Sequence, residues 1–232
     1  MTIEHPVEIP TALVPAGPFL MGDDAGRADE RPAHRVWLSA VRLALLPVTN
    51  REYAVFLAAT GHETPRFWDD QGFNAAGQPV VGVNWDAAVA YCEWLCAERD
   101  RRYRLPTEAE REKASRGGLE GVRFPWGDDL AEGGDHASQQ APRQVGLSAP
   151  NGYGLFDMAY NVHEWCSDWY DAGYYASSPE RDPQGPPSGT RRASRGGAWR
   201  HQVKVNRCAA RSSLDPTFRY NDYGFRVALD VE

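Results

Sequence analysis

The chain has 232 residues, of which 42% are hydrophobic, and its formal net charge is −7. An acidic chain argues against a nucleic-acid partner, because binding phosphates needs a concentrated basic surface. No apolar run approaches the ~18 residues needed to cross a bilayer, and the first residues lack the basic flank of a secretory signal, so we expect no membrane partner.

The four cysteines show no metal-binding spacing. Cys92 and Cys96 lie one turn apart on a predicted helix, where a disulfide would be strained. We therefore expect free thiols and a cytoplasmic location. No low-complexity linker divides the sequence, which indicates a single domain over residues 1–232.

Hydrophobic periodicity and turn residues indicate short elements joined by long loops. In chain order we predict strands at 13–22 and 34–45, helices at 50–59, 85–98 and 108–116, and short strands at 193–198, 207–212 and 223–231. Thr107 and Glu110 form a capping box at the start of the third helix. Residues 124–190 are rich in Gly, Pro, Asp and Trp and predict a long irregular layer.

Five sequence blocks occur in a characteristic order between about Pro15 and Val227. They are RLPTEAE at 104–110, NGYGLFDM at 151–158, RGGAWRH at 195–201, RCAARS at 207–212 and GFR at 224–226. Together they resemble the formylglycine-generating enzyme family, also called the sulfatase-modifying-factor family. The resemblance implies an α+β protein with a C-type-lectin-like fold: small antiparallel sheets, two main helices and abundant irregular loops.

The segment 157–165 resembles the structural calcium loop of this family. Asp157 and Glu164 would supply carboxylate oxygens, and Tyr160 and Val162 backbone carbonyls, the hard ligands that calcium prefers. Tyr160 stands where the family usually has Gly, a poor choice if the backbone there needs a positive φ. The alternative is two solvated acids beside a core methionine.

True formylglycine-generating enzymes bind copper(I) through two cysteines that follow the RGG block. Here His201 stands at the first of these positions, and the second cysteine is absent. The resemblance therefore predicts that copper–dithiolate chemistry is missing.

The family places four positions of this chain around its substrate groove: His163, Trp199, His201 and Asp222. We interpret these as candidate catalytic residues. Two imidazoles and one carboxylate are the ligand set of non-haem iron(II) oxygenases, so iron or another transition metal is a candidate cofactor. The alternative is a pair of histidines that are merely hydrogen-bonded in a polar cleft.

Arg200, Tyr220 and Tyr223 are candidate substrate-binding residues, because aromatic walls with a few charged groups suit a peptide or a small amphipathic molecule. Arg211 and Arg226 are interpreted instead as buried, ion-paired scaffold residues, since a buried arginine is usually paired.

Three functions remain open. The first is a metal- or oxygen-dependent oxidoreductase of this superfamily that acts on a peptide or small molecule without the copper–dicysteine mechanism. Its relatives include ergothioneine-type sulfoxide synthases, which take their iron histidines from a separate helical domain. The second is a non-catalytic C-type-lectin-like binding module, for example a diversified variable protein. The third is a formylglycine-generating enzyme with altered metal ligation. We favour the first, although a fold resemblance alone does not establish a function.

Overall fold

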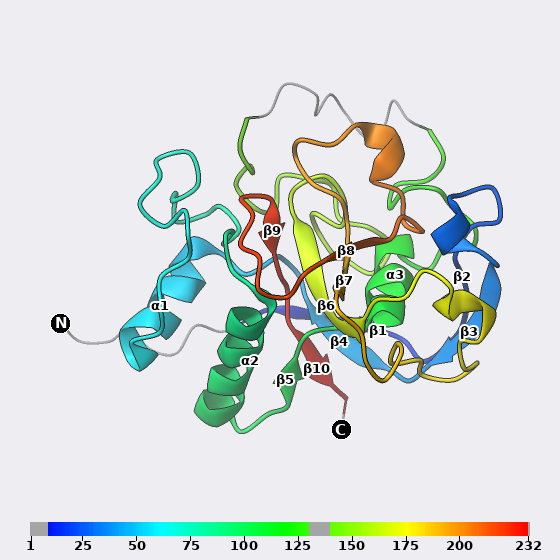
Figure 1. Cartoon of the computed structure of the whole chain (residues 1–232), viewed down its shortest axis with the longest axis horizontal. Helices are drawn as coiled ribbons and strands as arrows, with labels where there is room; N and C mark the ends of the chain where they lie inside the picture. The colour runs from blue at the N-terminus through cyan, green and yellow to red at the C-terminus, as the bar shows by residue number, and fades with distance from the viewer. Residues whose placement is uncertain (1–8, 130–139, 232) are drawn as a thin grey trace.

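The computed structural model describes residues 9–129 and 140–231 (Figure 1). The two ends of the predicted domain, 1–8 and 232, lie outside the described residues. Helices α1 and α2 lie at one end of the molecule and the β2–β3 hairpin at the other, with the remaining strands and α3 between them (Figure 1).

The first sheet joins both ends of the described chain. Its strands, in spatial order, are β1 (Thr11–Val14), β4 (Val41–Ala44), β10 (Ala228–Asp230) and β5 (Tyr103–Arg104). All neighbouring pairs are antiparallel, and Ala228 lies opposite Leu43 on one side and Arg104 on the other. Val41, Leu43 and Ala228 point into one apolar cluster, because alternate residues of a strand face the same side.

A two-stranded antiparallel hairpin consists of β2 (Gly17–Met21) and β3 (His34–Leu38). Sequence predicted one opening strand over 13–22 and one strand region over 34–45. The structure divides each into two strands that belong to different sheets. Pro15 and Ala16 separate β1 from β2, and the break in alternation at Val41 marks the start of β4.

The third sheet carries the candidate site. In spatial order its strands are β8 (Ser212–Leu214), β7 (Arg192–Arg195), β6 (His163–Trp169) and β9 (Tyr223–Gly224). Strand β6 pairs with β9 in parallel, which corrects the expectation of purely antiparallel sheets. It also interrupts the predicted irregular layer. Five of its seven residues are buried, so the strand lacks the apolar–polar alternation that would have revealed it.

Three α-helices occur in the described residues: α1 (Asn50–Thr60), α2 (Trp85–Arg99) and α3 (Glu108–Arg116). The capping box of α3 forms as predicted, since Thr107 Oγ1 accepts from Glu110 N at 3.1 Å and Glu110 Oε2 accepts from Thr107 N at 2.8 Å. Gly61 and Gly117 end α1 and α3 in the left-handed conformation that favours glycine.

The main apolar core lies between the helices and the third sheet. Aromatic rings dominate it: the Tyr91 ring centroid lies 5.7 Å from that of Tyr53 and 5.3 Å from that of Phe225. Trp165 of β6 is fully buried in the same core and donates from its indole nitrogen to the Val83 carbonyl at 3.1 Å. The strand that begins with His163 is therefore anchored from both faces.

Two details of the C-terminal part differ from expectation. Residues 207–211 form no strand, and β8 begins only at Ser212. Cys208, within the predicted strand over 207–212, is buried but lies in a turn, where its sulfur contacts Ser115 Oγ at 3.4 Å. All four cysteines are free thiols, and Cys92 is buried on α2. Among the described residues, no helix is both long and apolar enough to cross a membrane.

Candidate functional site

Strand β6 sends its first two side chains into different environments. Glu164 is fully buried, and both of its oxygens are bound by two arginines. Arg111 Nε donates to Oε2 at 2.7 Å and Arg226 Nε to the same atom at 2.6 Å, while the Nη2 atoms of both arginines donate to Oε1 at 3.1 and 2.8 Å. Burial alone would raise the pKa of Glu164, but the two guanidinium groups lower it. The Glu164 carboxylate is therefore ionised, and both of its oxygens already accept two hydrogen bonds each.

These contacts argue against Glu164 as a calcium ligand, and the predicted calcium loop stays a prediction. A calcium ion at Glu164 would have to displace two buried guanidinium groups whose positive charge repels it. Asp157 Oδ2 accepts from Gly146 N at 2.5 Å, whereas its buried Oδ1 has no hydrogen-bond partner among the described residues and lies 4.0 Å from Arg143 Nη2. Tyr160 has a φ of +76°, the left-handed conformation in which a non-glycine residue is strained. Val162 is buried directly before β6. The structure thus gives this segment a scaffold role that rests on arginines.

A second buried network involves α3. Glu108 accepts from Arg211 Nε at 2.8 Å and from Arg195 Nε at 3.1 Å. Glu112 pairs with Arg195 Nη2 at 2.9 Å and Arg116 Nη2 at 2.7 Å. The predicted scaffold role of Arg211 and Arg226 is confirmed by these ion pairs. We call the two sets of Arg–Glu contacts, centred on Glu108, Glu112 and Glu164, the Arg–Glu network.

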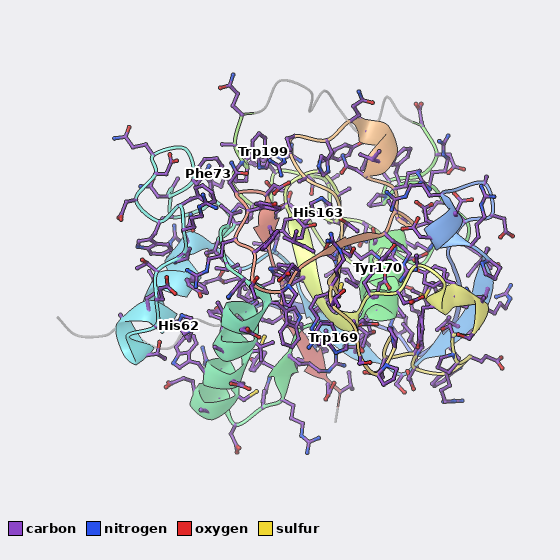
Figure 2. All side chains as sticks on the ribbon, in the orientation of Figure 1. His62, Phe73, His163, Trp169, Tyr170 and Trp199 are labelled. Atoms are coloured by element: carbon purple, nitrogen blue, oxygen red, sulfur yellow. The ribbon has the colours of Figure 1, made fainter. Side chains whose placement is uncertain are left out.

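His163 begins β6 and points away from that network. Its ring stacks on Tyr223 of β9, with 4.7 Å between centroids and 28° between planes. Its backbone N–H donates to the Asp222 carbonyl at 2.8 Å. The parallel pairing of β6 with β9 therefore fixes the positions of His163 and Asp222 together. Figure 2 shows His163 and Trp169 at opposite ends of β6.

His201 reaches the same place from the loop after β7. Gly197 has a φ of +66°, and a Cβ added there would lie 1.5 Å from Asn206 Oδ1, so only glycine fits this turn. The turn is held further by Trp199 N, which donates to the Asn161 carbonyl at 3.0 Å, and by His201 N, which donates to the Ala198 carbonyl at 2.9 Å. The RGG block of the sequence thereby positions the histidine.

The predicted ligand set converges. One ring nitrogen from each of His163 and His201 and one carboxylate oxygen of Asp222 lie within 4.8 Å of one another. The two imidazole centroids are 4.9 Å apart at an angle of 65°. We call these three residues the His–His–Asp cluster. Ligands bonded to one metal ion at ~2.0–2.3 Å lie roughly 3 Å apart, so binding needs the side chains to close by less than about 2 Å.

The polar atoms of this cluster are poorly satisfied. His163 Nδ1 is buried and has no hydrogen-bond partner among the described residues, and neither oxygen of Asp222 accepts a well-aligned hydrogen bond there. Asp222 is 1% exposed, and its one close partner in the described chain is Arg200, with Nε at 2.7 Å from Oδ2. Buried polar atoms without protein partners are uncommon, so their concentration at one point marks this cluster as the candidate functional site.

Burial sets the protonation states. It lowers the pKa of His163 to about 3, with the nearby His201, Arg200 and Arg27 adding to the effect. Burial also lowers the pKa of His201, against the opposing carboxylate of Asp222. For Asp222, burial raises the pKa, while Arg200 and His201 lower it. At neutral pH both imidazoles are uncharged, which is the form that coordinates a metal ion.

Three further predicted site residues are aromatic: Trp199 and Tyr223 are buried, and Tyr220 is exposed. Trp199 is 9% exposed, and its ring centroid lies 6.3 Å from that of Phe73. Both residues are labelled in Figure 2. Tyr223, predicted to bind substrate, is only 5% exposed and supports His163 from beneath, so that prediction is corrected. Tyr220 is 40% exposed, with its ring 6.3 Å from that of Tyr223.

Sequence reasoning missed the residues that lie between α1 and α2. Phe73 contacts Trp199 from that segment, and Arg66 joins Phe218, Arg219 and Tyr220 around a hollow of about 360 Å³. No motif or periodicity marks Phe73 or Arg66, so only the folded chain could reveal them.

The family model for the sulfatase-modifying factor enzyme 1-like domain matches residues 4–231. The chain belongs to this family. The formylglycine-generating enzyme of Streptomyces coelicolor is 37% identical over 94% of this chain and 88% of its own length. Hercynine oxygenase of Mycolicibacterium smegmatis is 32% identical over 95% of this chain and 61% of its own length.

A longer relative matches as well. The serine/threonine-protein kinase pkn1 of Chlamydia pneumoniae is 35% identical over 98% of this chain, but the chain spans only 39% of that kinase. The name of the larger protein therefore assigns no activity to this family member.

Two solved structures share the fold. Treponema denticola variable protein 1 superposes with a TM-score of 0.85 at 26% identity, covering 96% of this chain and 95% of that one. PvdO from Pseudomonas aeruginosa superposes with a TM-score of 0.82 at 28% identity, covering 95% of this chain and 94% of PvdO. These matches confirm the C-type-lectin-like fold expected for the family.

Proposed function

We propose that this protein is an oxidoreductase in which His163, His201 and Asp222 hold a transition-metal ion, and that it acts on a small molecule or peptide. The observation that carries the proposal is the convergence of three candidate ligand atoms within 4.8 Å, at a place where His163 Nδ1 is buried without a hydrogen-bond partner among the described residues. Iron(II) suits the donor set best, because two imidazoles and one carboxylate leave coordination positions open for oxygen activation.

The chain's own residues prepare the site. Tyr223 and the backbone of Asp222 hold the His163 ring in place, so little side-chain freedom is lost when a ligand binds. His201 is half-buried and the Arg200 side chain is 44% exposed, so the site opens to solvent on their side. The similarity to a hercynine oxygenase supports an oxidative reaction within this family.

Metal analysis of protein purified without chelator tests the proposal. We expect roughly one equivalent of iron or another transition metal per chain, and a loss of at least about 90% of it in His201→Ala, since a three-ligand site that loses one ligand binds far more weakly. His62→Ala is the matched control: this histidine lies beside Phe56 at the α1 end, well away from His163 in Figure 2. Equal metal content in His201→Ala and the unmodified chain would refute the site.

A binding module is the second candidate, because one specific surface favours it. Phe218 and Tyr220 are 45% and 40% exposed beside Arg66, and large exposed aromatic side chains often mark ligand contacts. The fold shared with a variable protein of Treponema denticola is compatible with this role. Purified protein that holds no transition metal and consumes no oxygen when supplied with iron(II) would favour this candidate.

A further inference from the structure

Arg200 stands at the solvent-exposed side of the His–His–Asp cluster. Its Nε lies 2.7 Å from Asp222 Oδ2, yet 44% of its side chain is exposed, whereas Asp222 is almost fully buried. The arginine can therefore leave the carboxylate by rotation into solvent without disturbing the core. The backbone turn that carries it is fixed on either side, by Trp199 N on the Asn161 carbonyl and by His201 N on the Ala198 carbonyl.

Asp222 cannot serve Arg200 and a metal ion equally well. A divalent ion bound to the same carboxylate would repel the guanidinium group at close range. In the described structure, the charges that act on the two imidazoles are Arg200, Arg27 and Asp222, with no second carboxylate among them. The ion pair with Asp222 is thus the arrangement expected before a metal ion enters.

The charge balance changes when the ion enters. With neutral imidazoles, Asp222 and Arg200 cancel one another. A divalent ion then raises the net charge of this group to +2, and a bound ion is usually the largest charge in its site. A site with that excess of positive charge favours a negatively charged ligand.

We propose that the metal-loaded site selects a substrate that bears a carboxylate, and that Arg200 leaves Asp222 to bind it. This inference rests on the proposed function. The guanidinium group presents paired N–H donors that match a carboxylate in two-point geometry, which lysine cannot reproduce. Tyr220, which is exposed and whose ring lies 6.3 Å from that of Tyr223, offers an aromatic surface nearby for the remainder of the molecule.

A cobalt-loaded protein allows the test, because the visible absorption of cobalt(II) reports both metal binding and changes at the ion. The probes are benzoate and benzamide, which share a ring and differ in charge. We expect the unmodified protein to bind benzoate at least about tenfold more tightly than benzamide. In Arg200→Gln the preference for benzoate over benzamide should fall below about threefold. The preference of Arg200→Lys should lie between those of Arg200→Gln and the unmodified protein.

The same variant should show an opposite effect on the metal. Arg200→Gln removes the group that competes for Asp222, so its dissociation constant for cobalt should decrease by roughly threefold to tenfold. A merely structural arginine would not tighten metal binding when removed. Arg35→Gln is the control for overall charge, because Arg35 forms an exposed ion pair with Glu120, 59% and 57% exposed. Arg35→Gln should leave the dissociation constants for cobalt and for benzoate unchanged.

The possible failures are distinguishable. If the unmodified protein binds no cobalt, the proposed metal site is wrong and this inference falls with it. If cobalt binds but benzamide competes as well as benzoate, the metal site stands and the carboxylate preference is refuted. If benzoate is still preferred tenfold in Arg200→Gln, the ion alone attracts the anion and the role of Arg200 is refuted.

Discussion

His163 and Glu164 are adjacent on β6, and both are buried, yet their surroundings are opposite. Glu164 is held by four hydrogen bonds from two arginines. His163 leaves a buried ring nitrogen without a hydrogen-bond partner among the described residues. It faces Asp222, whose one close partner there is the half-exposed Arg200. One strand thus supplies the Arg–Glu network on one side and the His–His–Asp cluster on the other.

The difference separates structural from functional polar residues. A buried charge that is fully paired makes the fold specific but has no capacity left for a ligand. A buried group with unused donors or acceptors costs stability unless something binds to it. Hydrogen-bond saturation therefore distinguishes Glu164 from Asp222 more clearly than burial or charge does.

The largest effect should come from breaking the Arg–Glu network. Glu164→Gln keeps the side-chain volume but leaves Arg111 and Arg226 as uncompensated buried charges. We expect a loss of about 3–5 kcal/mol in the free energy of unfolding. Urea denaturation measures this, and a loss below about 1 kcal/mol would show that the two regions do not differ as described.

Asp222→Asn should give the reverse pattern. Since the carboxylate is poorly satisfied and its partner Arg200 is half exposed, the metal-free protein should change in stability by less than about 1 kcal/mol. Its dissociation constant for a transition metal should rise by at least about tenfold, because a neutral amide replaces an anionic ligand. A strongly destabilised variant with unchanged metal affinity would place Asp222 in the scaffold.

The pH dependence of stability tests the protonation state of Asp168, which contacts Glu108 of the Arg–Glu network. Asp168 is buried and accepts from Glu108 N at 2.8 Å, and burial, together with the charge of Glu108, raises its pKa to about 7. The folded protein then holds a proton on Asp168 between about pH 4 and 7 that the unfolded chain does not, so this group's contribution to stability falls as the pH rises through that range.

Asp168→Asn removes the titration while keeping an acceptor for the Glu108 amide. Relative to the unmodified protein, the variant should gain about 1–3 kcal/mol in the free energy of unfolding between pH 5 and pH 8. The comparison of the two proteins cancels groups that titrate in both. A constant difference across this range would mean that Asp168 is ionised throughout.

The smallest effect is expected on the surface. Arg35→Gln breaks an ion pair whose two side chains are more than half exposed, so solvent already screens the attraction. The free energy of unfolding should change by less than about 0.5 kcal/mol, and the midpoint of urea denaturation should stay within experimental error. A larger loss would indicate that exposed pairs also belong to the scaffold.

Local signals predicted much of the fold. The capping box at Thr107 and Glu110 predicted the start of α3, because these residues bond to amides within the same turn. Strand β6 was missed because nearly all of its residues are buried and no alternation remains. The parallel pairing of β6 with β9 joins residues about 60 positions apart, which no local pattern encodes.

The sequence predicted the His–His–Asp cluster but not the partners of Glu164, because those partners are distant along the chain. The family resemblance placed His163, His201 and Asp222 together, and the structure brings them within reach of one ion. The calcium assignment of Glu164 did not anticipate Arg111 and Arg226, whose positions lie 53 and 62 residues away. Which of two acids is neutralised by distant arginines depends on tertiary packing, and sequence spacing does not contain that information.

The position of β10 in the first sheet has a consequence for how the chain folds. This strand, from Ala228 to Asp230, inserts between β4 and β5, which are made much earlier during synthesis. Until residues 228–230 have left the ribosome, the edges of β4 and β5 that face β10 stay unpaired, and open edges invite association with other chains. The sheet closes late and through distant contacts, which slows folding. A nascent chain that stalls shortly before residue 228 should therefore be a good substrate for chaperones.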